Sequence, residues 1–161
     1  MDETLLREEL VRLLRGDKAH MPFADAVKDF PEEHINDFPP NVSYSFWHII
    51  EHIRITQWDI IDFMLNPKYE EPKWPDDYWP KKEKMATKLL FAKSVARVEK
   101  DLQKLIEFVS DPTTDLNKPG VNGGGTVLRE ALLVADHNAY HTGEFAILRQ
   151  VIRLWGKDHT K

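Results

Sequence analysis

The fold is predicted first from a long stretch with helical periodicity near the C-terminus, TVLREALLVADHNAYHTGEFAILRQVIRLW (126–155). Thr126 is a good N-terminal cap for a helix, and Gly156 follows the stretch as a stop signal. Two polar residues about one turn apart, Asn138 and His141, interrupt an otherwise apolar stripe at helical spacing. The apolar members of that stripe are Val127, Ala131, Val134, Phe145, Leu148, Ile152 and Trp155. We predict one long helix over this stretch, with a polar feature in the middle of its buried face.

Three further long helices are predicted upstream, over residues 3–14, 43–66 and 80–110. Each carries apolar residues at helical spacing, and the second ends before Pro67, which cannot continue a helix. A short helix around residues 23–29 is also expected. Since no segment shows the alternation of a strand, the simplest architecture is an all-α four-helix bundle.

The segment between the second and third predicted helices, PKYEEPKWPDDYWP (67–80), is rich in proline and aromatic residues. It is too aromatic for a flexible linker, and we expect it to pack as a lid over one end of the bundle. Four aromatic residues in or near it either wall an apolar pocket or only pack the bundle end: Trp47, Trp74, Tyr78 and Trp79.

Composition limits the chemistry that the chain can perform. A chain of 161 residues, 42% of them hydrophobic, fits one compact domain, which we assign to residues 1–161. There are no cysteines, which excludes disulfides, thiolate nucleophiles and zinc bound by cysteine. Any metal must therefore bind to imidazole, carboxylate or water.

The charge pattern argues against nucleic acids and membranes as partners. The chain has 27 acidic and 22 basic residues, a net charge of −5, and no basic stripe that would bind a phosphate backbone. Arg149, Arg153 and Lys157 are expected to form a solvated helix end. No apolar run approaches the ~20 residues that span a bilayer, and the acidic N-terminus is not a secretory signal. We therefore expect a cytoplasmic protein.

The histidines carry the functional prediction. His137 and His141 are four residues apart, so both side chains leave the same face of the last predicted helix. His48 and His52 have the same spacing on the second predicted helix, and facing helices of a bundle commonly hold a metal between them. Imidazole ligands favour zinc or nickel, with manganese or iron as alternatives, over magnesium or calcium. The competing interpretation is that these are hydrogen-bonded core histidines.

Two segments resemble motifs of the DinB-like superfamily. SYSFWHIIEHIRITQWDI (43–60) resembles its second-helix motif, in which a Ser-x-Trp segment precedes a metal-binding histidine. GTVLREALLVADHNAYHTGEFAILRQ (125–150) resembles its C-terminal motif, H-x-x-x-H-x-G-Q. The resemblance extends to the order and rough lengths of all four predicted helices, and it implies a four-helix bundle with a three-histidine metal site.

The resemblance also selects the ligands. It places them on His52, His137 and His141, and leaves His48 as a neighbour of the site. The chain departs from the family pattern at Glu144, where glutamine is common. That carboxylate either accepts a hydrogen bond or a proton beside the metal, or it is solvated and inert.

The resemblance implies two classes of function. One is a metal-dependent enzyme that acts on a small molecule, either by transfer involving a low-molecular-weight thiol or by hydrolysis. The other is a metal-binding or structural protein without turnover, such as a stress-responsive dimer. The resemblance also suggests a homodimer, because many members of the superfamily are dimers, while the sequence itself leaves the oligomeric state open.

Overall fold

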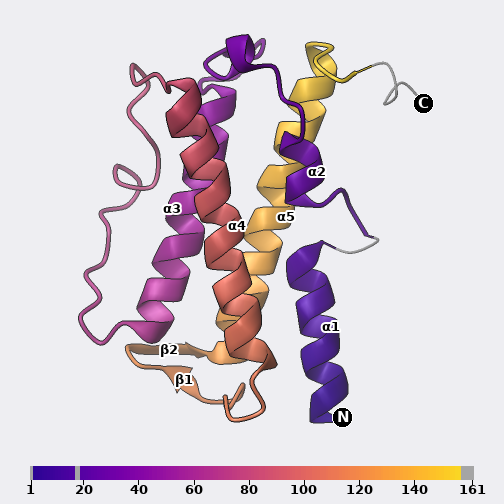
Figure 1. Cartoon of the computed structure of the whole chain (residues 1–161). Helices are drawn as coiled ribbons and strands as arrows, with labels where there is room; N and C mark the ends of the chain where they lie inside the picture. Colours follow the sequence, from indigo (N-terminus) through magenta and orange to yellow (C-terminus); the bar gives the residue numbers. More distant parts are fainter. Residues whose placement is uncertain (1, 17–18, 157–161) are drawn as a thin grey trace.

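The computed structural model describes residues 2–16 and 19–156, and these residues are mostly helical (Figure 1). They form five α-helices and one short two-stranded sheet. The helices are α1 (Glu3–Arg15), α2 (Phe23–Val27), α3 (Phe46–Leu65), α4 (Lys88–Ser110) and α5 (Val127–Val151). A 3₁₀ turn spans Glu32–His34, and strands β1 (Pro119–Gly120) and β2 (Gly123–Thr126) pair antiparallel. The predicted helical class is confirmed.

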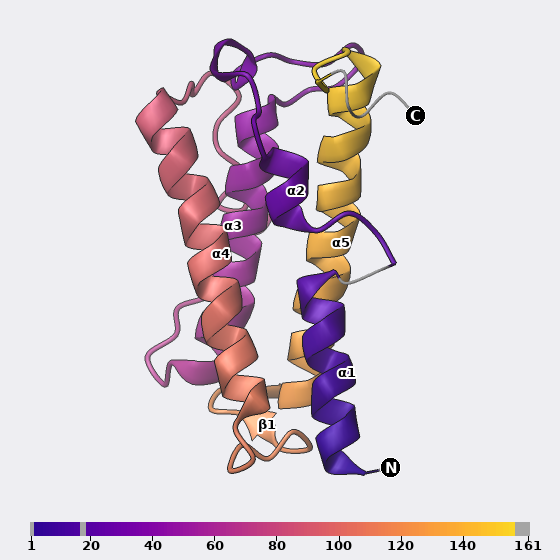
Figure 2. The same ribbon diagram turned by 45° about the vertical axis from the view of Figure 1, so that its right-hand side comes forward.

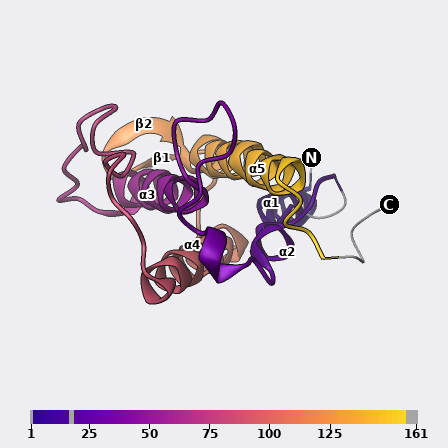
Figure 3. The ribbon, with the colours of Figure 1, turned by 90° about the horizontal axis from the view of Figure 1, so that it is seen from above.

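The long helices α3, α4 and α5 lie side by side, and α1 and α2 follow one another along α5 (Figures 1 and 2). Seen from above, α1 and α2 lie on the opposite side of the molecule from α3, next to α5 (Figure 3). That side is therefore formed by two helices in succession, the first predicted long helix and the short predicted helix.

The start of α4 corrects the prediction, which placed it at Pro80. The helix begins at Lys88, where the Thr87 side chain accepts a hydrogen bond from the Leu90 N–H at 3.2 Å. The chain before it is held by tertiary contacts instead, because the side chain of Asn36 pairs with both backbone groups of Ala86. These contacts outweigh the preference of proline for a first helical turn.

Two further predictions were wrong in detail. A small hairpin, β1–β2, precedes α5, although no strand was expected; strand β2 begins with Gly123 and Gly124, whose φ angles of 80° and 76° favour glycine. Helix α5 ends at Val151 rather than at Trp155, and Arg153 follows with a positive φ of 60°.

The sequence predicted that Arg149 is part of a solvated helix end, and this prediction was wrong. Its side chain is 2% exposed and donates to the carbonyl oxygens of Ala26, Lys28 and Asp29. These bonds attach the end of α2 to the last turn of α5 and satisfy the buried guanidinium. Arg153 is exposed, while Lys157 lies outside the described residues, as does His159.

The buried apolar residues form two clusters. One cluster joins α1 to the ends of α3, α4 and α5 nearest the hairpin, and the other joins α2 to the opposite ends of those helices. Between them along α3 and α5 lie the buried residues Gln57 and Asn138, whose side chains are hydrogen-bonded at 2.7 Å. The core therefore has a polar middle layer.

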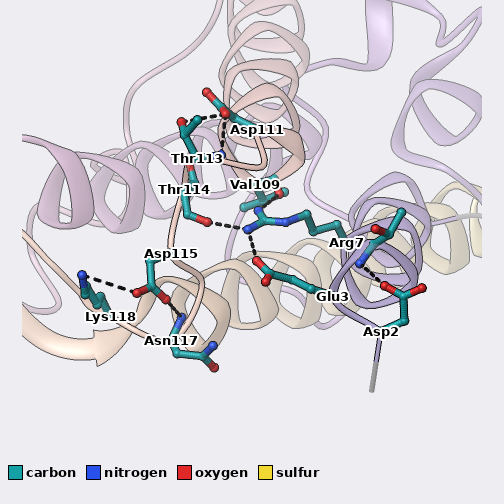
Figure 4. A network of polar contacts seen from close by, with 11 residues as sticks. Asp2, Glu3, Arg7, Val109, Asp111, Thr113, Thr114, Asp115, Asn117 and Lys118 are labelled. Carbon is teal, nitrogen blue, oxygen red and sulfur yellow. Dashed lines mark hydrogen bonds and ion pairs between the residues drawn. The ribbon is translucent and has the colours of Figure 1, made fainter.

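Arg7 fastens α1 to the end of α4 (Figure 4). Its guanidinium donates to the carbonyl oxygens of Val109, at 2.7 Å, and Thr114, and it also pairs with Glu3. Carbonyls at a helix C-terminus lack partners within the helix, so this side chain supplies them. Among the described helices, none is both long and apolar enough to cross a membrane.

Candidate metal centre

Three histidine side chains converge between α3 and α5. These two helices lie next to each other (Figure 3). His52 comes from α3, and His137 and His141 come from consecutive turns of α5. One ring nitrogen of each lies within 4.8 Å of the others, and the ring centroids are 4.5–4.9 Å apart. This group of three could hold a metal ion, and it consists of the residues that the sequence analysis selected.

The His52 ring is fixed by the segment that follows α3. Its Nδ1 lies 2.8 Å from the carbonyl oxygen of Tyr78, which can only accept, so Nδ1 carries the proton. The indole of Trp79 stacks on the same ring, with centroids 3.8 Å apart and planes inclined by 8°. Nε2 of His52 therefore carries the lone pair, and it faces Nε2 of His137 on α5 at a distance of 3.1 Å.

The His141 ring is fixed by Glu144 in the same way. Its Nδ1 donates to Oε2 of Glu144 at 2.8 Å, and the Tyr44 hydroxyl donates to Oε1 of that carboxylate. His141 thus also has its proton on Nδ1 and its lone pair on Nε2. Metal-bound histidines typically donate their second ring N–H to a carboxylate or a carbonyl, as these two do.

The third ring, His137, has the geometry of a ligand that lacks its ion. Its Nε2 lies 3.1 Å from Nε2 of His52, close to the separation of about 3.3 Å expected for two nitrogens bound at ~2.0–2.1 Å to one tetrahedral ion. Its Nδ1 is buried and has no hydrogen-bond partner in the described part of the chain. The donor set and its spacing therefore fit a divalent metal.

The electrostatic environment keeps two of the rings neutral. Burial, with a smaller contribution from the neighbouring His141, lowers the pKa of His52 to about 4 and that of His137 to about 3. Burial raises the pKa of Glu144, but the hydrogen bonds from His141 and Tyr44 outweigh it, and the net pKa lies below its ordinary value. Near neutral pH the His52 and His137 rings are therefore neutral and the Glu144 carboxylate lies beside the group, which suits a divalent cation.

His48 lies near the site, but both of its ring nitrogens bind other groups. Its Nδ1 accepts from the backbone N–H of Ser45 at 3.3 Å, while Ser45 caps the first turn of α3 in return. Its Nε2 lies 3.1 Å from the carbonyl oxygen of Lys81, so the proton of this ring is on Nε2. Both ring nitrogens are therefore occupied, and the expectation that His48 is a neighbour agrees with this placement.

The four aromatic residues singled out in the sequence divide into two groups. Trp79 and Tyr78 contact His52, whereas Trp47 is buried in the core and Trp74 is 70% exposed. Sequence reasoning missed Tyr44 and Tyr140, whose rings surround the site.

The two missed tyrosines flank the histidine motifs. Tyr44 holds Glu144 and stacks on Trp79, and Tyr140 packs edge-on against His141 with centroids 4.8 Å apart. Tyr140 could have been found from its place beside His141, whereas the contact of Tyr44 with Glu144 has no local signal. A pocket of about 380 Å³ adjoins the centre through two of its lining residues, Tyr44 and Trp79.

Comparison with known protein families gives a match to the DinB superfamily over residues 15–145, a span that includes all three histidines of the group. None of the curated proteins and none of the solved structures matches. The family match covers most of the chain and agrees with the two motifs seen in the sequence. The chain therefore belongs to the DinB superfamily.

Proposed function

We propose that this protein binds one divalent metal ion through Nε2 of His52, His137 and His141, and that it uses this centre in a reaction on a small molecule. The observation that carries the proposal is the convergence of three imidazoles, two of them held with their lone pairs directed toward the common point. We also propose that the long helices form the four-helix bundle that the DinB motifs imply, with α1 and α2 sharing one side.

The proposed reaction is thiol-dependent transfer or hydrolysis. Three protein ligands leave at least one coordination position for a substrate or water, as in catalytic sites. A divalent metal, zinc or nickel first and manganese or iron next, would supply Lewis acidity and lower the pKa of a bound thiol or water. The adjoining pocket walled by Tyr44 and Trp79 supports a small-molecule substrate, including a low-molecular-weight thiol.

Within this proposal Glu144 orients His141 and does not act as a free base. Both of its carboxylate oxygens already accept hydrogen bonds, one from His141 and one from Tyr44. A base must reach the proton that it removes, and the protons nearest to this carboxylate are those of its two present donors. Its charge also favours a cation held by the adjacent imidazole.

A binding function without turnover is the second candidate. It is favoured by the enclosure of the centre, since His52 and His141 are more than nine-tenths buried and Trp79 covers one ring face. A stress-responsive homodimer that binds a metal without catalysis belongs to this class. Binding of an added thiol to the loaded protein separates the two candidates.

The test is a reconstitution followed by a substrate screen. The metal-free protein is loaded in turn with Zn²⁺, Ni²⁺, Mn²⁺ and Fe²⁺, then assayed with small thiols plus electrophilic acceptors and with hydrolysable esters and amides. The Co²⁺-loaded protein reports thiol binding through a charge-transfer band. We expect metal-dependent turnover that His137→Ala abolishes and His34→Ala retains. Stoichiometric metal with no thiol band and no turnover would favour the binding function.

A further inference from the structure

Asp59 is a buried carboxylate that the proposed reaction does not use. It lies on α3, seven residues beyond His52, and is 8% exposed. In the described part of the chain it forms no ion pair. Its Oδ1 accepts from the Tyr69 hydroxyl and its Oδ2 accepts from the Tyr78 hydroxyl, each at 2.7 Å. Burying a carboxylate without a cation costs free energy unless hydrogen bonds satisfy it. The two tyrosine hydroxyls supply these hydrogen bonds.

Both tyrosines belong to the segment that joins α3 to α4, residues 66–87, which we call the strap. The strap runs along the outside of α3 (Figures 1 and 3). Burial, together with the hydrogen bond to Asp59, raises the pKa of the Tyr69 and Tyr78 hydroxyls above the ordinary value. The hydroxyls therefore remain proton donors at any physiological pH, and the two anchors persist.

Tyr78 is attached to α3 at two points. Its hydroxyl binds Asp59 at 2.7 Å, and its carbonyl oxygen binds Nδ1 of His52 at 2.8 Å. Seven helical residues separate these attachment points by about 10 Å, a fixed distance along one rigid helix. The next residue, Trp79, lies flat on the His52 ring. The hydroxyl anchor thus sets the position of both groups that hold the ring.

We propose that Asp59 is a positioning residue of the metal centre, acting through Tyr78. By fixing the Tyr78 carbonyl, Asp59 keeps His52 in the tautomer with the proton on Nδ1 and the lone pair on Nε2. The inference rests on the proposed metal site for its effect on affinity, but its effect on the His52 tautomer exists without any metal.

Tyr69 provides a matched control for this idea. Its hydroxyl binds the same carboxylate at the same distance as that of Tyr78, and both residues lie on the strap. The rings contacted by Tyr69 include Phe63 but not His52. Tyr69→Phe and Tyr78→Phe therefore each remove one hydroxyl from Asp59, and only the second loosens the residue that holds His52.

The experiment measures Zn²⁺ affinity by competition titration and the His52 tautomer of the metal-free protein by ¹⁵N NMR of the ring. Loss of an orienting hydrogen bond typically lowers metal affinity ~10–100-fold. We expect about 10-fold weaker binding for Tyr78→Phe, with less Nδ1–H tautomer, and less than about 3-fold for Tyr69→Phe. Asp59→Asn, which can accept only one hydroxyl, should fall between them and serves if Tyr78→Phe does not fold.

Equal losses in the two phenylalanine variants, or an unchanged His52 tautomer in Tyr78→Phe, would overturn the positioning role. If the wild-type protein binds no Zn²⁺, the proposed function fails, and the tautomer of the metal-free protein still decides whether Asp59 positions His52. A tautomer shift in Tyr78→Phe alone, without metal binding in any variant, would support the positioning role and reject the metal site.

Discussion

The histidine pairs on α3 and α5 have the same spacing, but they differ in how many of their rings face the site. On α5, His137 and His141 both turn their rings toward the site, and their centroids are 4.5 Å apart. On α3, only His52 does so, while His48 closes the first helical turn with Ser45 and binds the carbonyl of Lys81. The α5 pair lies in mid-helix, where the backbone is already paired, whereas His48 lies where N–H groups still need acceptors.

The spacing of two histidines determines which helix face they share. The hydrogen-bond partners of each ring determine which of its nitrogens carries the lone pair. His52 and His48 lie one turn apart and both bind carbonyls of the strap, yet they do so with opposite nitrogens. Nε2 of His52 faces the other two histidines of the group, whereas both nitrogens of His48 bind groups outside it.

Removing a proposed ligand should have the largest effect. His141→Ala or His52→Ala deletes one of three metal bonds, and we expect metal affinity to fall by at least about 100-fold. Isothermal titration with Zn²⁺ measures the change, with the partly exposed His34, which lies outside the group, mutated to alanine as the control. Wild-type affinity in His52→Ala would place the site elsewhere.

Acid should destabilise the metal-free protein through the same rings. The pKa values of His52 and His137 are lowered to about 4 and about 3 by burial, so below the ordinary value of about 6.5 the unfolded chain binds protons that the folded chain does not. Stability is therefore full above pH ~6.5 and falls as the pH drops toward 4. We expect a loss of about 2 kcal/mol for each of the two rings between pH 7 and pH 4.5, measured by urea unfolding.

A variant without these rings checks the origin of that acid sensitivity. The double variant His52→Gln and His137→Gln should show a shallower dependence of unfolding free energy on pH over the same range. An equally steep dependence would assign the acid sensitivity to other groups.

Neutralising Glu144 should have a moderate effect. Glu144→Gln can still accept from His141 but loses the charge beside the metal, and we expect about 10-fold weaker metal binding. Tyr44→Phe, which removes the other hydrogen bond to the carboxylate, should weaken binding by a smaller factor. If Glu144→Gln binds metal as tightly as the wild type, the carboxylate has no orienting role.

Changing His48 should affect metal binding least. Glutamine at this position can also close a capping box with Ser45, so His48→Gln should keep the helix start while losing the bond to Lys81. We expect about 1 kcal/mol lower unfolding free energy and less than about 3-fold change in metal affinity. A larger loss of affinity than in His52→Gln would show that the roles of the two histidines are reversed.

The sequence predicted the parts of the molecule that local patterns encode. The long apolar stripe of α5 and its i, i+4 histidines were visible in the sequence, and the DinB motifs selected His52 from the α3 pair. The start of α4 was missed because Pro80 is a suitable first helical residue, whereas long-range contacts such as that between Asn36 and Ala86 hold the preceding chain outside the helix.

The supporting contacts of the site could not be predicted for the same reason. Tyr44 and Glu144 are a hundred residues apart in sequence and meet through one hydrogen bond. The pairing of Asp59 with Tyr78 depends on the path of an irregular segment, and no periodicity reports such a path. Arg149 was misjudged because its acceptors are backbone carbonyls, which any sequence can supply.

Anomalous X-ray diffraction at the zinc edge, from crystals of the zinc-loaded protein, tests the proposed three-histidine metal centre directly. We predict one anomalous peak per chain, ~2.0–2.1 Å from a ring nitrogen of each of His52, His137 and His141. A peak bound elsewhere, or three converging rings with no peak between them at saturating zinc, would contradict it.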